Sequence, residues 1–143
     1  TVGIKPPGGC HYPAAGYAEF ARLLEPHLAR DLYGRKPGED IASPNLKRAT
    51  WATSERDSIT LEFDSPVLWD DRLQNEFQLD GQPARVVSAT VTDKRLTLKF
   101  ASPITAQRIT YLDSSNWNPD RLLLGTNGLA AFTFCDVQIQ ARE

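Results

Sequence analysis

The stretch VSATVTDKRLTLKF, residues 87–100, decides the fold of this chain, because apolar and polar side chains alternate along both of its halves. Val87, Ala89 and Val91 alternate with Ser and Thr, and the alternation resumes after Asp93-Lys94 on two leucines and a phenylalanine. A period of two residues is typical of a strand with one buried face, and the two polar residues between the halves favour a tight turn. The stretch therefore predicts a β-hairpin.

Further segments on both sides of the hairpin carry the same strand signature, with turn residues between them. They are residues 46–53, 59–63, 77–79, 108–112 and 131–140. In the last of these, Phe132 and Phe134 share one parity while Val137 and Ile139 share the other, so we expect a β-bulge near Cys135-Asp136. Six to eight short strands separated by turns predict a mainly β fold, specifically an antiparallel β-sandwich of immunoglobulin-like type.

The N-terminal part has a helical period instead. Its apolar side chains recur every three or four residues, at Tyr17, Phe20, Ala21, Leu24 and Leu28. This spacing predicts an amphipathic helix whose apolar face needs a partner surface. Pro13 suits the first helical turn, Pro26 should kink the helix or split it after Glu25, and Gly34 is a plausible C-cap ending the second piece near Tyr33.

The change of period marks a boundary between two parts. Residues 35–44 are polar and contain two prolines and a glycine, which is typical of a linker. We therefore divide the chain into a helical segment, residues 1–36, and a β domain, residues 37–143. The first residues include neither a starting Met nor a signal-peptide core, which favours a mature product or an excised piece of a longer protein.

Composition excludes several classes of function. The 143 residues are 41% hydrophobic and carry a formal net charge of −2, with both signs mixed along the chain. Without a basic field to attract a phosphate backbone, we expect no nucleic-acid partner, and without a long apolar run we expect no membrane partner. Neither a zinc-type ligand cluster nor a phosphate-binding glycine loop occurs, so we expect no cofactor and no metal.

Two cysteines, Cys10 and Cys135, lie near opposite ends of the chain. A disulfide between them would close a loop of nearly the whole chain and would stabilise the fold by about 4–5 kcal/mol in the loop-entropy model. The alternative is two separate thiols, and the spacing does not decide between them. A bridge would imply an oxidising compartment, and we expect a secreted or periplasmic location.

His11 is the first candidate for chemistry, because it lies in a glycine-rich turn immediately before the predicted helix. Loops held by rigid elements commonly carry catalytic bases. A base of this kind needs a Ser or Cys nucleophile within hydrogen-bond reach and usually a carboxylate that orients the imidazole. The other reading of a single loop histidine is an ordinary, partly exposed side chain.

The block that follows, CHYPAAGYAEFA at residues 10–21, resembles the last catalytic block of SGNH/GDSL-type esterases, in which an Asp-x-x-His motif precedes a closing helix. The far end is similar to the terminal segment of sialate O-acetylesterases, through the residues at 109–111, Asn118-Pro119, Leu123 and 127–134. The FQLDG sequence at 77–81 also resembles the β-rich tail of that family. The resemblance implies the C-terminal part of a carbohydrate esterase, with His11 as catalytic base.

Two departures from that family matter for function. The position of its triad Asp, three residues before His11, is Gly8. No Gly-Asp-Ser or Gly-x-Ser-x-Gly sequence is present, so the nucleophile of such an enzyme would come from an N-terminal α/β hydrolase body that these residues do not contain. This chain alone is therefore not expected to hydrolyse esters. The resemblance implies that body and an acetylated carbohydrate as partners.

Two loop tryptophans, Trp69 and Trp117, are candidate sugar-binding residues, because an indole offers a flat apolar face. Packing against the sheet is the alternative for each, and Trp51 belongs to a predicted strand and to the core. The oxygen-bearing residues near Trp117 do not have the spacing of an EF-hand and are typical of turns. A second hypothesis for the whole chain is a non-catalytic accessory or carbohydrate-binding module.

Overall fold

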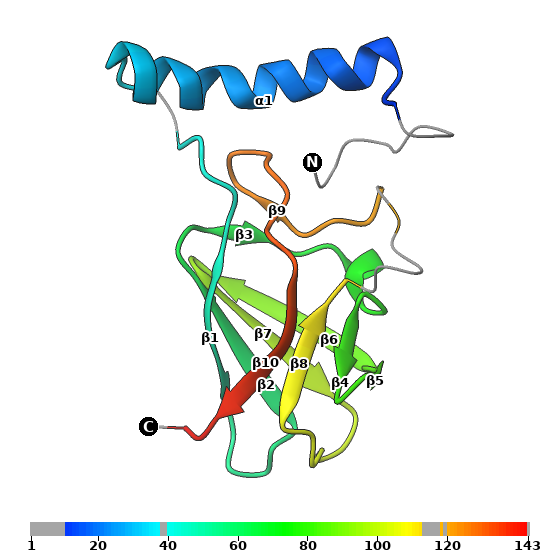
Figure 1. Ribbon diagram of the computed structural model, residues 1–143. Coiled ribbons are helices and arrows are strands. Elements are labelled where there is room, and N and C mark those ends of the chain that lie inside the picture. Colours follow the sequence, from blue (N-terminus) through cyan, green and yellow to red (C-terminus); the bar gives the residue numbers. More distant parts are fainter. Residues whose placement is uncertain (1–10, 38–39, 113–117, 119, 143) are drawn as a thin grey trace. The chain divides into compact units, whose positions relative to one another are not determined.

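The computed structural model describes residues 11–37, 40–112, 118 and 120–142. The chain divides into two compact units, Thr1–Ala42 and Ser43–Glu143. The first unit contains a helix, and the second contains the strands (Figure 1). No helix in the described part of the chain is both long and apolar enough to cross a membrane.

Helix α1 spans Ala14–Tyr33 without interruption, so the predicted split after Glu25 is wrong. Pro26 lies inside the helix, where it removes one backbone hydrogen bond while the turns on either side keep theirs. Gly34 ends the helix as predicted, with φ 64° in the left-handed region that glycine adopts without steric cost. The backbone N–H of Gly34 donates to the Ala29 carbonyl.

In its described residues, the β unit has ten strands and one short 3₁₀ helix. They are β1 (Leu46–Trp51), β2 (Ser58–Phe63), β3 (Val67–Leu68), η1 (Asp71–Leu73), β4 (Phe77–Leu79), β5 (Gln82–Pro83), β6 (Val86–Thr92), β7 (Arg95–Phe100), β8 (Arg108–Tyr111), β9 (Leu124–Gly125) and β10 (Phe134–Gln140). Eight of them form one sheet in the order β5-β4-β8-β10-β1-β2-β7-β6, and β3 pairs with β9 separately. Figure 1 shows this sheet curling around the interior of the unit.

The mainly β fold with one preceding helix is confirmed, whereas the immunoglobulin-like sandwich is not. The larger set of strands forms one continuous sheet, and its middle is a parallel pair of β1 with β10. Sequence alternation identifies which side chains of a strand face the core, but it does not identify the neighbouring strand. The parallel pairing of the first strand, β1, with the last, β10, therefore could not be predicted from the alternation of side chains.

The predicted hairpin is β6 and β7, which pair in antiparallel register across the turn at Asp93-Lys94. Its alternation is confirmed in β7, where Leu96 and Leu98 are 0% exposed. The predicted bulge in β10 is also confirmed, because the register against β8 shifts between Phe134 and Val137. Asp136 adopts φ 50° at this point. Because of the bulge, Phe134 before it and Val137 and Ile139 after it all pack against the same core.

Candidate functional site

His11 lies three residues before the start of α1, and its side chain is exposed. Its Nδ1 is 3.3 Å from the hydroxyl oxygen of Tyr17, one turn into the helix. The Tyr17 ring meets the Tyr12 ring edge-on, with centroids 5.8 Å apart. In the described part of the chain, His11 has neither a carboxylate nor a nucleophilic Ser or Cys as a hydrogen-bond partner. The imidazole can accept a proton, but the group that would lose that proton must come from elsewhere.

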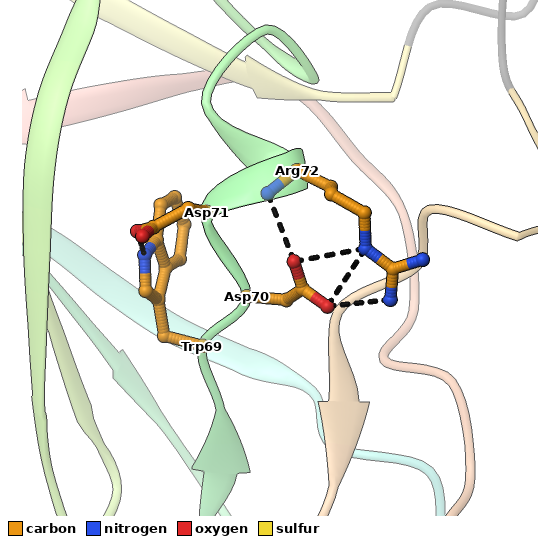
Figure 2. Close-up of polar contacts among 4 residues, drawn as sticks. All are labelled: Trp69, Asp70, Asp71 and Arg72. Atoms are coloured by element: carbon orange, nitrogen blue, oxygen red, sulfur yellow. Dashed lines mark hydrogen bonds and ion pairs between the residues drawn. The ribbon is translucent and has the colours of Figure 1, made fainter.

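Trp69 lies between β3 and η1, where it is partly buried and packs against the core. Its indole N–H donates to Oδ1 of Asp71 at 2.8 Å, as Figure 2 shows. Its ring stacks on Phe77, with centroids 6.3 Å apart and planes inclined by 27°. Two independent contacts therefore fix the orientation of the indole.

Asp70 and Arg72 form a two-pronged ion pair, which Figure 2 shows on the opposite side of the chain segment from the Trp69 indole. The Arg72 Nε donates to both Asp70 oxygens at 3.0 and 2.9 Å, and Nη2 donates to Oδ2 at 2.5 Å. The backbone N–H of Arg72 adds a bond to Oδ1 at 2.9 Å, which starts η1. The side-chain bonds from Arg72, and then its backbone bond, lower the pKa of Asp70 to about 2. Asp70 is therefore ionised throughout the neutral range.

Glu76 and Arg121 supply a second ion pair next to these residues. Glu76 is only 8% exposed, and its Oε1 is 3.4 Å from Nη1 of Arg121. Burial raises the pKa of Glu76 above its usual value, and the charge of Arg121 opposes that rise. The hydrogen bonds to Asp70 raise the pKa of Arg72, and the charge of Asp120, next to Arg121, adds a smaller contribution in the same direction. Two ion pairs thus lie in and just after η1: Asp70–Arg72 at its start, and Glu76–Arg121 beyond its end.

Replacement of Glu76 by glutamine is expected to stabilise the protein at neutral pH. The folded state holds the Glu76 proton more tightly than the unfolded chain does, so the stability that Glu76 contributes is fully present below its unfolded pKa. That contribution is lost as pH rises through the raised folded pKa. In urea unfolding between pH 3.5 and 8, the free energy of unfolding of the variant should rise relative to that of the native protein as pH increases. A constant difference across this range would mean that ionisation of Glu76 is not penalised in the fold.

The structure describes some of the other predicted site residues and not others. Trp117 and Cys10 lie outside the described residues, so the sugar-binding role of Trp117 and the Cys10–Cys135 bridge stay predictions. Cys135 is exposed and pairs with no cysteine in the described part of the chain. His11 and Trp69 belong to different units of the chain. The contacts of Asp71, Arg72 and Glu76 were not predicted, although Trp69-Asp70-Asp71-Arg72 carries the Asx signal of a helical turn.

Among residues 11–37, 40–112, 118 and 120–142, no three His, Cys, Asp or Glu side chains gather as metal ligands would. Near the predicted turn at 118–120, the side-chain oxygen of Asn118 accepts the backbone N–H of Asp120 at 2.8 Å. This is the local hydrogen bond by which Asx residues stabilise turns.

Comparison with known proteins places the fold beside one class of enzyme. No protein-family description matches the sequence, and no curated protein matches it closely. A crystal structure of a carbohydrate acetylesterase from Xanthomonas citri matches with a TM-score of 0.64 and 19% sequence identity. The match covers 92% of this chain and 30% of that enzyme. The chain therefore shares the fold of part of a carbohydrate acetylesterase and spans less than a third of its length.

The region that matches the acetylesterase includes part of α1 as well as the β unit. The uncovered 8% of 143 residues amounts to about 11 residues, which is fewer than the 20 residues of α1. Some of α1 therefore lies inside the matched region together with the β unit.

Proposed function

We propose that this chain is the C-terminal part of a carbohydrate acetylesterase of SGNH type, similar to sialate O-acetylesterases, and that His11 is its catalytic base. One observation carries the proposal: 92% of the chain matches the fold of an acetylesterase of which the match covers only 30%. A serine-bearing α/β body would supply the rest of the active site. The His11 block and the similarity of the tail at 109–134 support the finer assignment.

In this proposal the serine Oγ attacks the acetyl carbonyl, and Nε2 of His11 takes the serine proton. The same proton then passes to the departing sugar oxygen, and water hydrolyses the acetyl-enzyme in the reverse order of proton transfers. An orienting group must hold the imidazole, and Gly8 cannot supply a carboxylate. The Tyr17 hydroxyl, 3.3 Å from Nδ1, is placed to accept the Nδ1 proton and leave Nε2 as the base.

The apolar face of α1 supports the need for a partner body. Large apolar side chains along one face of the helix remain substantially exposed: Tyr17 48%, Phe20 40%, Leu24 39%, Leu28 43% and Leu32 69%. A contiguous apolar stripe of this kind marks an interaction surface. We infer that the α/β body covers this stripe, which would hold the start of α1, and with it His11, against the serine.

The test is acetate release by the protein in which this chain accompanies its serine-bearing body. That protein should release acetate from acetylated oligosaccharides, and a serine-directed organophosphate should abolish the release. Residues 1–143 alone should release none. Hydrolysis by residues 1–143 alone, or no hydrolysis of any acetylated sugar by the longer protein, would contradict the proposal.

A further inference from the structure

We propose that strand β6 is the surface through which two copies of this chain associate, by antiparallel pairing with β6 of the second copy across a two-fold axis at Thr90. The strand lies in the β unit, so the inference goes beyond the proposed function and does not rest on it. It applies equally to an esterase domain and to a non-catalytic module.

The two edges of the eight-stranded sheet differ in their protection against a further strand. The sheet ends at β5 on one side and at β6 on the other. β5 has two residues, and one of them is Pro83, which has no N–H to donate. β6 has seven residues, VVSATVT, with neither a charge nor a proline. Natural sheet edges are blocked by short length, proline, charge or a bulge, and β6 has only a register shift between Val86 and Ser88, at its start.

Ala89 and Val91 direct their backbone N–H and C=O groups away from the sheet. On β7 the N–H of Phe100 donates to the Asp57 carbonyl at 2.9 Å, so the even-numbered residues of β7 face β2. Successive residues of a strand direct these groups to alternate sides, so the odd-numbered residues of β7 face β6, where they oppose its even-numbered residues. The groups of the odd-numbered Ala89 and Val91 therefore point outward, and the described part of the chain places no strand on that side.

A register centred on Thr90 uses these outward groups. It places Ala89 of each copy opposite Val91 of the other, and both pairs exchange two backbone hydrogen bonds. Main-chain bonds of this kind provide the affinity when a strand is added to a sheet edge. A register centred on Ala89 would instead use Val87, whose carbonyl already accepts the Gln74 side-chain amide at 3.5 Å next to the register shift. Centring on Thr90 leaves that contact undisturbed.

The outward hydroxyl side chains of β6 are complementary to themselves in this register. Thr90 opposes its own copy, and Ser88 opposes Thr92 of the second copy, so each pair joins two hydroxyls, as cross-strand threonine pairs do. A row of register partners already crosses four strands to this position: Thr50 on β1, Thr60 on β2, Thr97 on β7 and Thr90 on β6. Within it, the hydroxyl oxygens of Thr60 and Thr97 are 3.0 Å apart. A second copy would continue this row across the axis.

The charge distribution also favours a second copy as the partner. A two-fold axis brings identical groups together, so a charged edge strand would repel its own copy. β6 is uncharged, and the charged residues opposite it, Arg95 and Lys99, lie on β7, one strand further from the axis. On the other face Ala89 and Val91 are partly buried against the core and would contact each other across the axis. Because a single strand forms the contact, the association should be weak and depend on concentration.

The experiment measures amide hydrogen exchange in the intact 143-residue chain by NMR at increasing protein concentration. Exchange at Ala89 and Val91 should slow by at least about threefold between dilute protein and about 1 mM, because the dimer forms by mass action. The amides of Thr90 and Thr92, which face β7, should exchange slowly at every concentration. Exchange at Ala89 and Val91 that does not change with concentration would overturn the proposal. Association through the exposed apolar side chains of α1 would give that negative result.

Charge substitutions at Thr90 test the position of the axis. Thr90→Lys and Thr90→Glu should each weaken self-association by about fivefold or more, because two like charges then oppose each other. An equimolar mixture of these two variants should regain the protection of Ala89 and Val91, since lysine then opposes glutamate. Thr105→Lys is the matched control, because Thr105 is exposed in the loop after β7, and it should associate like the native chain. Undiminished association of folded Thr90→Lys, or no recovery in the mixture, would overturn the pairing at Thr90.

Discussion

Replacement of His11 by alanine is expected to lower acetyl-ester hydrolysis by at least about a thousandfold in the protein that joins this chain to its serine-bearing body. The serine hydroxyl is a poor nucleophile until a base removes its proton, and loss of that base in serine hydrolases costs several orders of magnitude in kcat. The His11 side chain is exposed and precedes α1, so its truncation should leave the fold intact. The measurement is the rate of acetate release at saturating substrate, together with a thermal unfolding curve.

His27 offers a matched control, because it is the other histidine of the chain and lies within α1. His27→Ala should retain the native rate. Tyr17→Phe tests the orienting hydroxyl near Nδ1. It should lower kcat by about tenfold, less than loss of a general base costs, because the hydroxyl only orients the imidazole, while KM stays near the native value. Native activity in His11→Ala would remove this histidine from the mechanism.

The parts of the fold that the sequence predicted are those set by neighbours along the chain. The hairpin at 87–100 combines two alternating runs with a two-residue turn, and both signals are local. The bulge at Asp136 follows from a change of parity inside a single strand. Gly34 ends α1 because glycine adopts positive φ at low cost. In each case one short segment contains all the information that the feature requires.

Features that depend on distant residues were not predictable in the same way. The parallel pairing of β1 with β10 joins segments about ninety residues apart, and alternation is compatible with many strand orders. The short β3–β9 pair has only two residues in each strand, too few for a detectable period. The continuity of α1 across Pro26 also differs from expectation, because a proline signals the loss of one hydrogen bond and not the strength of the flanking turns.

The same distinction between local and long-range information applies to the candidate site residues. His11 was identified from its local setting, and Trp69 from its residue type and its loop. The stacking of Trp69 on Phe77 and the ion pair between Glu76 and Arg121 are tertiary contacts, which the local sequence does not specify. A sequence pattern can therefore identify a candidate tryptophan, but the fold determines which side chains contact it.

The largest effect on stability is expected at Tyr111, whose hydroxyl accepts the backbone N–H of Leu123 at 2.6 Å. Both residues are 0% exposed, so water cannot replace this bond. Burial raises the pKa of Tyr111 to about 12, so the hydroxyl stays protonated well into the alkaline range. Tyr111→Phe leaves the Leu123 amide unsatisfied inside the protein, and should lower the free energy of unfolding by about 1–3 kcal/mol.

Tyr111→Ala should cost more, because it also removes the ring from an aromatic row. The Tyr111 ring lies 5.2 Å from Phe77 and 5.7 Å from Phe134, between strands β4 and β10 that flank β8. Truncation of a buried aromatic costs about 3–5 kcal/mol, and the unsatisfied amide adds to it. Against a total stability of about 5–15 kcal/mol, this variant should lose roughly half of the free energy of unfolding or more. Urea unfolding measures both variants, with Tyr33→Phe, at a 76% exposed site, expected to match the native protein. If Tyr111→Phe also matched it, the buried hydroxyl would contribute nothing, and the ring alone would account for any loss in Tyr111→Ala.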